Sequence, residues 1–590
     1  MPGTRKDRSK YKMLHRLFLK SEFSFAVSDL SLATGSMADL FFVSMYLGVN
    51  GITALGYVAP IVQIFGFIGT TVGNGSKAKV SSLLGAGNRE EGNKVFSTSV
   101  GIGAGTAAVC AILVMLFCSR VALLLGARAP EVFDIARQYI YGFSIGVPFY
   151  VGTRILRPYL QLEGQYRRLN IIAGLTTAAS IIGDMAVVFL FRGNMFGIAF
   201  ATSIGDIGAF CISAEYFLRK KSFYRFSVRE IRIPLFAEVV KLGSASAAIK
   251  GSRVVGVAII NNLLTALNIE YLVGAHGVFS QIAAFIRSAW FAPADSLINF
   301  CGVMIGEEDR ESLKEAQRIS LIHAAVYCDI ITLILYLLAP NIAGIFLRDA
   351  DPAGLELGTR CIRVACFSIP LNFIVYNFYH YLITIKRVRF NILYSFLIEC
   401  GSLVPITLLL LRILGYTGAW IAMCVNSVIL SAIALLYIAL NKEGEGFREK
   451  MLLMPSDFGF TDETEMDLVS TSPEDIEDLS KAGIAFALEN GADKKRARTY
   501  GLITEELAGI LVQHGFDDGK PHNIWIRFIA KGEDLIIRLR DDCRPFNVTE
   551  YYQLMDKHDE KEIGLLIIMG MAKDIRYTTA LGANNLIIRI

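Results

Sequence analysis

An acidic residue interrupts the apolar stretch GSMADLFFVSMYLG at residues 35–48. The carboxylate of Asp39 is costly at membrane depth unless it has a partner or lines water. A chain that keeps such a group has a use for it, and two chemistries suit a lone acid: binding a proton and binding a cation. The structural alternative is a satisfied group that caps a broken helix or accepts a hydrogen bond from a backbone amide.

Other polar side chains fall inside later apolar runs of the chain. Lys250, Arg253 and Asn261 share one run, Asp295 lies in the next, and Glu399 in a later one. Because polar groups in lipid must pair or line water, we expect a polar network here, with either a structural or a functional role. Glu399 is alternatively a binding group for a cationic substrate. Asn261 is expected to make either a contact in the transport pathway or a helix-packing hydrogen bond.

The runs that hold these residues are long enough to cross a membrane. Of 590 residues, 53% are hydrophobic and only 19% are charged, whereas soluble domains are about a quarter charged. A span needs about 20 apolar residues. Twelve runs satisfy this, centred near residues 35, 63, 106, 143, 179, 206, 250, 285, 331, 370, 402 and 428. The predicted fold is an all-α polytopic membrane protein with twelve transmembrane helices.

The two halves of this region repeat each other. Three pairs of segments share one offset of 221 residues: GAGNREE (85–91) with GEEDRES (306–312), RLNI (168–171) with RFNI (389–392), and GIAFA (197–201) with GAWIA (418–422). The repeat predicts two six-helix lobes, an N-lobe at 23–220 and a C-lobe at 235–440. Since each has an even number of spans, the lobes keep one orientation, which suits alternating access around a central cavity.

Basic residues set the expected orientation. One set of alternate loops carries clusters of Lys and Arg, among them Lys77/Lys79/Arg89/Lys94 and Arg157/Arg167/Arg168. The positive-inside rule places these loops, the basic tail at 1–22 and the C-terminus in the cytosol. His380 then lies near the cytosolic end of its span, where we expect an interfacial ring, and Asp206 is expected to be structural.

Three stretches of the membrane region resemble the multidrug and toxic compound extrusion (MATE) family: MADLFFVSMYLGVNGITALGYVAPI, GNGSKAKVSSLLGAGNREEGNKVFSTSV and GNMFGIAFATSI. The resemblance covers about residues 15–440. It implies a plasma-membrane antiporter that exports organic, often cationic, compounds against an inward H⁺ or Na⁺ gradient. It also implies one acid in span 1, matched by Asp39, and another in span 5, matched by Asp184. Ser180 stands where the family commonly has an asparagine, one turn before that second acid.

Elementary electrostatics supports the pair independently of the family. Two acids on different helices can share a cation, or one can hold a proton because its neighbour is charged. Unloading restores a charge that favours another packing of the helices. Because serine is a shorter and weaker oxygen ligand than asparagine, Ser180 favours H⁺ over Na⁺ as the coupling ion.

The chain changes character after the last span. Residues up to 454 carry a net charge of +13 and the remainder −9. We expect a linker at 441–461 and a soluble α/β domain, an α+β sandwich, at 462–590. Its elements are a strand at 464–469, helices at 472–491 and 494–513, a hairpin at 523–542, a helix at 564–575 and a last strand at 585–590.

This element order resembles the histidine-kinase-like ATPase fold, in particular the anti-sigma-factor serine kinase branch. Glu505 matches the glutamate that primes water, Asp541 the adenine-contacting acid and Gly564 the last glycine box. The resemblance would imply ATP and Mg²⁺, but the position of the family's metal-binding asparagine is held by Gly509, or by Ile510 if Glu506 is the matching glutamate, and neither residue binds a metal. We therefore expect a nucleotide-sensing domain or one that docks a cytosolic protein partner.

Two other functions compete with the exporter. A lipid-intermediate flippase of related two-lobe fold is kept open by Lys250 and Arg253, which suit anionic head groups. A membrane-anchored signalling kinase is the second, and the missing metal ligand argues against it. The partners expected of an exporter are a small organic substrate and the lipid bilayer, and no nucleic acid, catalytic residue or resident metal is expected.

Overall fold

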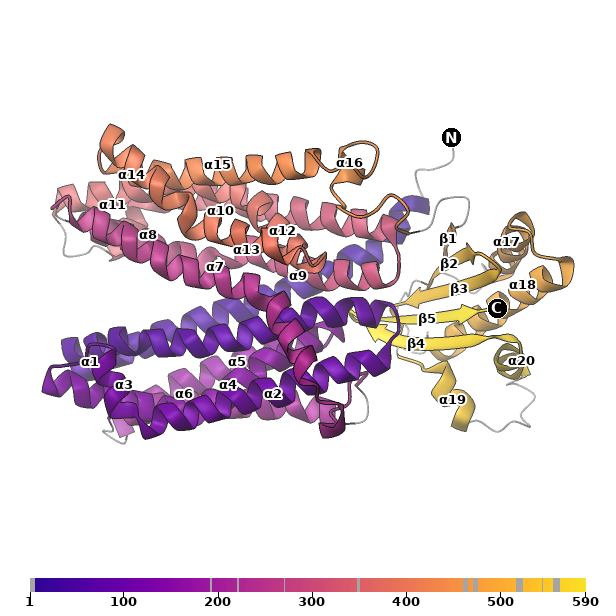
Figure 1. Ribbon diagram of the computed structural model, residues 1–590, viewed down its shortest axis with the longest axis horizontal. Coiled ribbons are helices and arrows are strands. Elements are labelled where there is room, and N and C mark those ends of the chain that lie inside the picture. The colour runs from indigo at the N-terminus through magenta and orange to yellow at the C-terminus, as the bar shows by residue number, and fades with distance from the viewer. Residues whose placement is uncertain are drawn as a thin grey trace.

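The computed structural model describes residues 6–190, 194–219, 222–269, 271–346, 351–459, 465–470, 476–515, 524–543, 545–554 and 563–590. Its helices form two groups that lie side by side along the long axis of the molecule (Figure 1). The indigo to purple group is the N-lobe and the magenta to orange group is the C-lobe. A small domain with a sheet lies at one end, next to the turns at 85–89, 162–166 and 306–310. We call this the domain-facing end.

The N-lobe begins with α1, which runs from Lys6 to Gly85 but is broken at Gly48, where φ is +57°. The break turns one element into two spans, because a left-handed residue cannot continue the helix. The other N-lobe elements are α2 (Arg89–Leu116), α3 (Cys118–Leu124), α4 (Pro130–Leu162), α5 (Tyr166–Met185), the π-helical turn η1 (Ala186–Leu190) and α6 (Met195–Leu218).

The C-lobe follows after the short 3₁₀ turn η2 (Val228–Glu230). Its elements are α7 (Ile233–Thr265), α8 (Leu272–Ile286), α9 (Ser288–Gly306), α10 (Arg310–Phe346), α11 (Pro352–Ala365), η3 (Cys366–Ser368), α12 (Ile369–Thr384), α13 (Val388–Phe396), the π-helical turn η4 (Leu397–Gly401), α14 (Leu403–Leu414) and α15 (Thr417–Ala439). The short helix α16 (Phe447–Lys450) leads toward the C-terminal domain.

Ten helical segments of the described chain are long and apolar enough to cross a membrane. The protein is therefore a mostly helical polytopic membrane protein, but the prediction of twelve transmembrane helices is not confirmed. The two expected spans that fall short lie in α4 and in α8–α9. Arg154 and Arg157 lower the hydropathy of α4. The other span is interrupted at Arg287, which leaves α8 with only 15 residues, and Asp295 lowers the hydropathy of α9.

The lobes touch through glycines at the domain-facing end. A β-carbon on Gly85 would lie 2.0 Å from the carbonyl oxygen of Val303, and one on Gly306 would lie 1.9 Å from that of Ser82. These two contacts are related by the same 221-residue offset as the sequence repeat, so the interface is reciprocal, as expected about a pseudo-two-fold axis. Only glycine allows such close backbone approach.

A second glycine contact lies farther from that end. A β-carbon on Gly75 of α1 would meet the carbonyl oxygen of Val239 at 1.9 Å, and one on Gly243 of α7 would meet that of Thr71 at the same distance. Small residues at helix crossings drive association in membranes through van der Waals contact. The two crossings together hold the lobes in contact.

The C-terminal domain contains β1 (Glu465–Ser470), α17 (Ile476–Glu489), α18 (Lys494–Gly515), β2 (Ile524–Lys531), β3 (Asp534–Asp541), α19 (Val548–Leu554), α20 (Ile563–Met571), β4 (Asp574–Ala580) and β5 (Ala583–Arg589). The sheet is antiparallel throughout, in the order β1-β2-β3-β5-β4. The hairpin at β2–β3, its turn at Gly532 and the last strand confirm the sequence prediction. Residues 574–575 were expected to end a helix and instead begin β4. The expected helix start at 472–475 lies outside the described residues.

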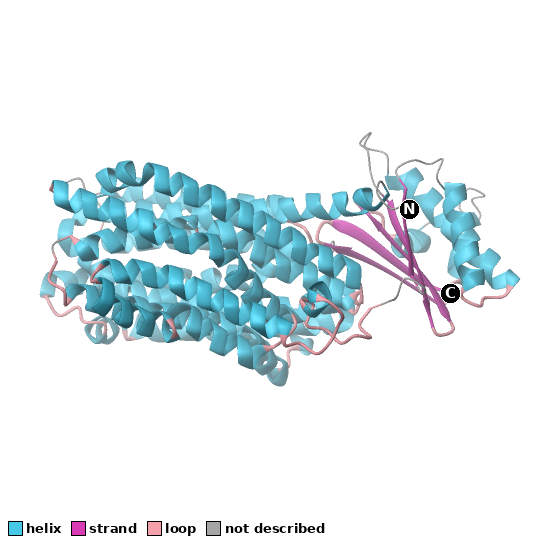
Figure 2. Ribbon diagram, turned by 90° about the horizontal axis from the view of Figure 1, so that it is seen from above, coloured by secondary structure: helices cyan, strands magenta, loops and turns pink. Residues whose placement is uncertain are grey.

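The sheet lies between the helical bundle and the domain's own helices (Figure 2). Side chains alternate between the two faces of each strand. Ile526, Phe528 and Ile537 belong to the core shared with α17, α18 and α20. Trp525 and Arg527, on the alternate positions, face the bundle. The sheet therefore buries both of its faces.

We predict that Gly306→Ala lowers the stability of the closed lobe interface by about 2 kcal/mol, because the added methyl group overpacks a backbone contact. The thermal midpoint of the purified protein measures this. Gly174→Ala is the matched control, since a β-carbon there would meet nothing within 4 Å. An equal midpoint for both variants would contradict the close contact.

Candidate functional site

Asp39 and Ser180 meet inside the N-lobe. The Ser180 hydroxyl on α5 donates a hydrogen bond of 2.6 Å to Oδ1 of Asp39 on α1. Asp184 lies one turn after Ser180 on the same helical face, and its carboxyl group is near enough to interact electrostatically with that of Asp39. The four-residue spacing therefore places all three predicted residues in one site, which we call the N-lobe acid site.

Asp184 is the unusual member of this site. It is fully buried, and no basic, hydroxyl or amide donor among the described residues reaches its carboxyl oxygens, whose polar neighbour is the carboxyl group of Asp39. An unpaired buried carboxylate is strongly unfavourable, so the group is compatible with this packing when it is protonated or holds a cation. The helix also widens into the π-helical turn η1 directly after Asp184, a distortion frequent at functional sites.

Two further polar side chains belong to the electrostatic surroundings of this pair. Tyr139 of α4 is close enough to feel the charges of Asp39 and Asp184, and Asp206 of α6 interacts with Asp39 and with Arg154. Sequence reasoning missed Tyr139, because one tyrosine in an apolar run carries no distinctive signal. Three acids thus share the interior of the N-lobe.

The predicted C-lobe residues do not form one network, and only two of them pair with each other. Arg253 on α7 makes an ion pair with Glu399 in η4, and the Tyr376 hydroxyl donates a 3.2 Å hydrogen bond to the same carboxylate. Since Glu399 is neutralised by this pair, its pairing role is the one the geometry supports. Asn261 lies two turns farther along α7, where its carbonyl accepts a bond from Thr265.

Asp295 pairs across the lobes with a lysine that the sequence placed in a basic loop. Lys77 is only 1% exposed, lies inside α1, and its Nζ is 3.2 Å from Oδ1 of Asp295. The expectation of a loop position for Lys77 is therefore wrong. His380 is also buried, with its Nε2 3.9 Å from the same carboxylate, so it is not an interfacial ring. Both predictions were wrong because the helices continue beyond their most apolar residues, so that Lys77 and His380 lie inside the bundle and not at its surface.

A cavity of about 420 Å³ lies between the lobes. The N-lobe lines it with parts of α1 and α4, and the C-lobe with parts of α7, α9 and α12. Lys250 borders it and donates a 2.7 Å hydrogen bond to Oγ1 of Thr70 in the other lobe. We call this space the central cavity. Its size is within the usual range of small-molecule sites.

The C-terminal domain binds an acidic turn of the C-lobe. Glu307 and Asp309, each at most 2% exposed, enter the bundle-facing side of the sheet. Glu307 pairs with Arg540 and accepts a 2.9 Å bond from Asn585, while Asp309 lies 2.8 Å from Arg527. Burial raises the pKa of Asp309, but the charges of Arg527 and Arg540 outweigh it and hold the pKa well below its usual range.

The same domain also contacts the N-lobe. The backbone amide of Leu581 in the β4–β5 turn donates a 2.6 Å bond to the carbonyl of Leu162 at the end of α4. Arg576 donates to the carbonyl of Ala86 at 3.3 Å. The domain therefore bridges the turns of both lobes at the domain-facing end.

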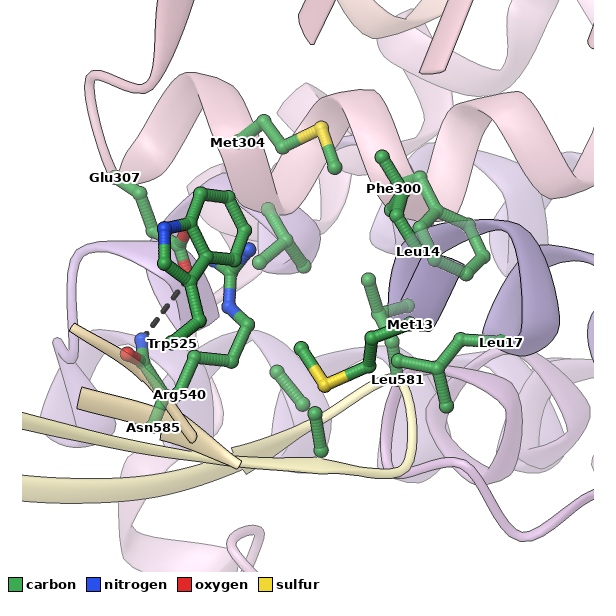
Figure 3. A pocket seen from close by; sticks show the side chains of 13 residues that line it. Met13, Leu14, Leu17, Phe300, Met304, Glu307, Trp525, Arg540, Leu581 and Asn585 are labelled. Carbon is green, nitrogen blue, oxygen red and sulfur yellow. Dashed lines mark hydrogen bonds and ion pairs between the residues drawn. The ribbon is translucent and has the colours of Figure 1, made fainter. Parts of the chain in front are cut away.

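An apolar cluster completes this interface (Figure 3). It joins three segments that are far apart in sequence, and its members are Met13, Leu14 and Leu17 of α1, Phe300 and Met304 of α9, and Trp525 and Leu581 of the sheet. Arg540 stacks over the Trp525 ring at 5.0 Å while it pairs with Glu307. One sequence signal could have located this interface: residues 307–309 are acidic (EED), whereas the equivalent residues 86–88 of the other half are uncharged (AGN).

The residues matched to a nucleotide site are used within the domain. Oδ1 of Asp541 accepts hydrogen bonds from Asn584 at 2.6 Å and from the amide of Cys543 at 3.0 Å. Glu505 is exposed on α18. A β-carbon on Gly564 would lie 1.8 Å from a carboxyl oxygen of Glu506. No group of three His, Cys, Asp or Glu side chains able to hold a metal occurs in the described ranges.

The two lobes with a shared cavity define a polytopic membrane transporter. The MatE family model matches residues 25–204 and 255–409, more than half of the chain. The protein therefore belongs to the MATE family of multidrug export transporters, whose members are secondary transporters and not enzymes. The C-terminal domain lies outside the matched residues, and its resemblance to a histidine-kinase-like ATPase is not confirmed.

Individual relatives agree with this assignment. Multidrug export protein MepA of Staphylococcus saprophyticus is 23% identical over 448 residues, covering 74% of this chain and 97% of that protein. MepA of Staphylococcus aureus is 20% identical over 406 residues, covering 68% and 88%. The bent form of the Vibrio cholerae MATE transporter VcmN has the same fold, with a TM-score of 0.68, 19% identity, and coverage of 75% of this chain and 98% of that one.

We predict that Glu399→Gln destabilises the protein by about 3 kcal/mol, because Arg253 is left as an uncompensated buried charge. Thermal unfolding of the purified protein measures the change. The double variant with Arg253→Gln is expected to recover most of the loss. Glu311→Gln, in an exposed pair with Lys314, is the control and is expected to cost less than about 1 kcal/mol. A double variant no more stable than the single one would contradict the pairing.

Proposed function

We propose that this protein is an ion-coupled antiporter that exports organic compounds across the plasma membrane by alternating access between its lobes. The observation that carries the proposal is the fully buried Asp184, whose carboxyl group has the carboxyl group of Asp39 as its neighbour and no basic partner among the described residues. A carboxyl group in that position changes charge when its proton or cation leaves, and the change alters which helix packing is favourable.

The coupling step follows from the geometry of the N-lobe acid site. With Asp184 neutralised, Asp39 keeps the hydrogen bond from Ser180 and the lobe holds the present packing. Loss of the ion leaves two interacting carboxylates in a buried site, and their repulsion favours a packing that admits water. H⁺ suits this site better than Na⁺, because Ser180 is a donor to Asp39 here and adds little to a cation's oxygen shell.

The orientation that we propose places both termini and the domain-facing end in the cytosol. It rests on the basic tail and on basic residues such as Arg167 and Arg168 near that end. The glycine crossings then close the cytosolic side of the central cavity. In this arrangement α4 and α8–α9 complete twelve spans despite their charges.

The coupling proposal is tested by efflux from vesicles loaded with organic dyes, under an imposed pH gradient or Na⁺ gradient. Asp39→Asn and Asp184→Asn are each expected to reduce gradient-driven efflux to the passive leak, because neither variant can change charge with the ion. Asp134→Asn, an exposed acid at the start of α4, is the matched control and keeps full activity. Unchanged efflux in both site variants would refute the N-lobe coupling site.

For the C-terminal domain we propose a regulatory role. It bridges Ala86 and Leu162 of the N-lobe to Glu307 and Asp309 of the C-lobe. Since opening toward the cytosol requires these ends to separate, a docked domain opposes that opening. A nucleotide or a cytosolic protein that binds the domain would change the strength of docking. The kinase alternative is disfavoured by Asp541, whose Oδ1 already accepts two internal hydrogen bonds.

We predict that Asp309→Asn weakens docking by about 3 kcal/mol, since Arg527 loses its buried partner. Asparagine still accepts the bond from the Ser312 amide, so α10 keeps its cap. Proteolysis of the linker at 441–461 is expected to accelerate, and efflux is expected to rise. Glu308→Gln in the same turn is the control, because its pair with Lys531 is exposed.

The pH dependence of docking has a definite sign. The pKa of Asp309 is lower in the docked state than in the undocked state. Its contribution to the free energy of docking is therefore complete above the undocked pKa of about 4, and it is lost as the pH falls through the docked pKa. Docking through this pair is therefore expected to be constant between about pH 6 and pH 8. Linker proteolysis measured across that range checks the expectation, and a steep change there would contradict it.

A further inference from the structure

The charge of the central cavity is opposite to that expected for a cation exporter. Four basic side chains border it, namely Arg154 and Arg157 of α4, Lys250 of α7 and Arg287 at the start of α9. Only two acids, Asp29 and Asp295, border the same space. The side chains come from both lobes, so a ligand between them would touch both.

Both acids already form ion pairs with cations other than Arg154, Lys250 and Arg287. Asp29 lies 3.9 Å from Arg157. Asp295 is 3.2 Å from Lys77, which is fully buried beside the cavity. Among the described residues, no carboxylate lies within ion-pair distance of the three remaining cations, Arg154, Lys250 and Arg287. We call these three the cationic triad.

The hydrogen-bonding and stacking partners of the triad are neutral groups. Lys250 is bonded to the Thr70 hydroxyl, and the Arg154 guanidinium stacks over the Tyr150 ring at 4.4 Å. The Nε of Arg154 is buried without a hydrogen-bond partner in the described part of the chain. Lys250 is near enough to both arginines to be repelled by them. Asp29 is near enough to attract all three cations, and Asp206 attracts Arg154, but neither acid lies at ion-pair distance from the triad. An anion among the three cations would therefore stabilise them further.

We propose that the central cavity binds an organic anion, whose carboxylate, sulfonate or phosphate group lies among Arg154, Lys250 and Arg287. This inference names the substrate class of the proposed exporter and rests on that function. Phe25, Phe291 and Tyr379 also line the cavity and provide aromatic surface for an apolar body. A soluble amphiphilic anion and an anionic lipid head group share this chemistry.

An organic cation fits the same space poorly. It would meet the repulsion of the triad, and its natural partner Glu399 is engaged by Arg253. The anion also has a mechanical effect, since it attracts Arg154 of the N-lobe and Lys250 of the C-lobe at once. Substrate binding would therefore draw the two lobes together.

Two dyes with one ring system and opposite charge test the proposal. Fluorescein is anionic and rhodamine 123 is cationic, and both are built on a xanthene ring. Their binding to the purified full-length protein is measured by fluorescence anisotropy, with no ion gradient. We expect fluorescein to bind more tightly than rhodamine 123. Lys250→Gln and Arg287→Gln are each expected to weaken fluorescein binding about tenfold, because each removes one charge-assisted contact.

Two further variants separate binding from folding. Lys250→Arg keeps the charge and is expected to bind fluorescein within about threefold of the original protein. Arg167→Gln removes an exposed arginine at the start of α5 and is expected to bind like the original. Tighter binding of rhodamine 123 than of fluorescein would overturn the proposal. Fluorescein affinity that is unchanged in both glutamine variants would overturn it as well. Gradient-driven efflux is a separate readout, so fluorescein binding without efflux would refute the antiporter but leave the anion site standing.

Competition identifies the source of the anion. Dihexanoyl phosphatidylglycerol represents a lipid head group, and naphthalene-1-sulfonate represents a soluble amphiphile. Displacement of fluorescein by either one supports the anion site and shows which source it prefers. Displacement by neither would count against it.

Discussion

The cost of holding a charge away from water organises this protein. Wherever the chain places an ionised side chain inside the bundle, a partner usually accompanies it, as Glu399 accompanies Arg253 and Asp295 accompanies Lys77. Two places depart from this rule. Among the described residues, Asp184 has no basic partner, and no carboxylate lies at ion-pair distance from the cationic triad. A transporter needs such incomplete sites, because its ion and its substrate are the partners that arrive and leave.

The internal repeat explains why the two lobes make equivalent contacts with each other. It also shows where their contacts with the C-terminal domain differ. Gly85 and Gly306 occupy equivalent positions and make equivalent backbone contacts, so the closed end is symmetric. The turns that follow these two glycines are not symmetric in their contacts with the C-terminal domain. Ala86 offers a carbonyl to Arg576, whereas the equivalent Glu307 offers a carboxylate to Arg540. The domain therefore docks in one orientation only, because the acid occurs on only one of two otherwise similar turns.

Sequence reasoning predicted the parts of the site that depend on local spacing. Ser180 and Asp184 are four residues apart on one helix, and this spacing predicts that they share a helical face. The charged residues inside the apolar runs are also evident from the sequence. It did not predict partners across the lobes, such as Lys77 for Asp295, because tertiary packing decides them. Lys77 and Arg157 were assigned to loops for the same reason: a basic residue near a span end is assigned to a loop unless the packing is known. In the C-terminal domain the hairpin was predicted from its turn, while β4 was missed because it directly follows the apolar α20.

The charge of the substrate also determines how the membrane potential acts on transport. With the cytosol negative, moving one elementary charge across the membrane is worth about 2.3 kcal/mol per 100 mV. Export of an organic cation in exchange for one H⁺ moves no net charge, so the potential contributes nothing. Export of a monovalent anion in exchange for one H⁺ is equivalent to moving two positive charges into the cytosol. The membrane potential then favours both the entry of H⁺ and the exit of the anion. If the cavity binds an anion and the N-lobe acid site binds H⁺, as we propose, the membrane potential would act on both the ion and the substrate.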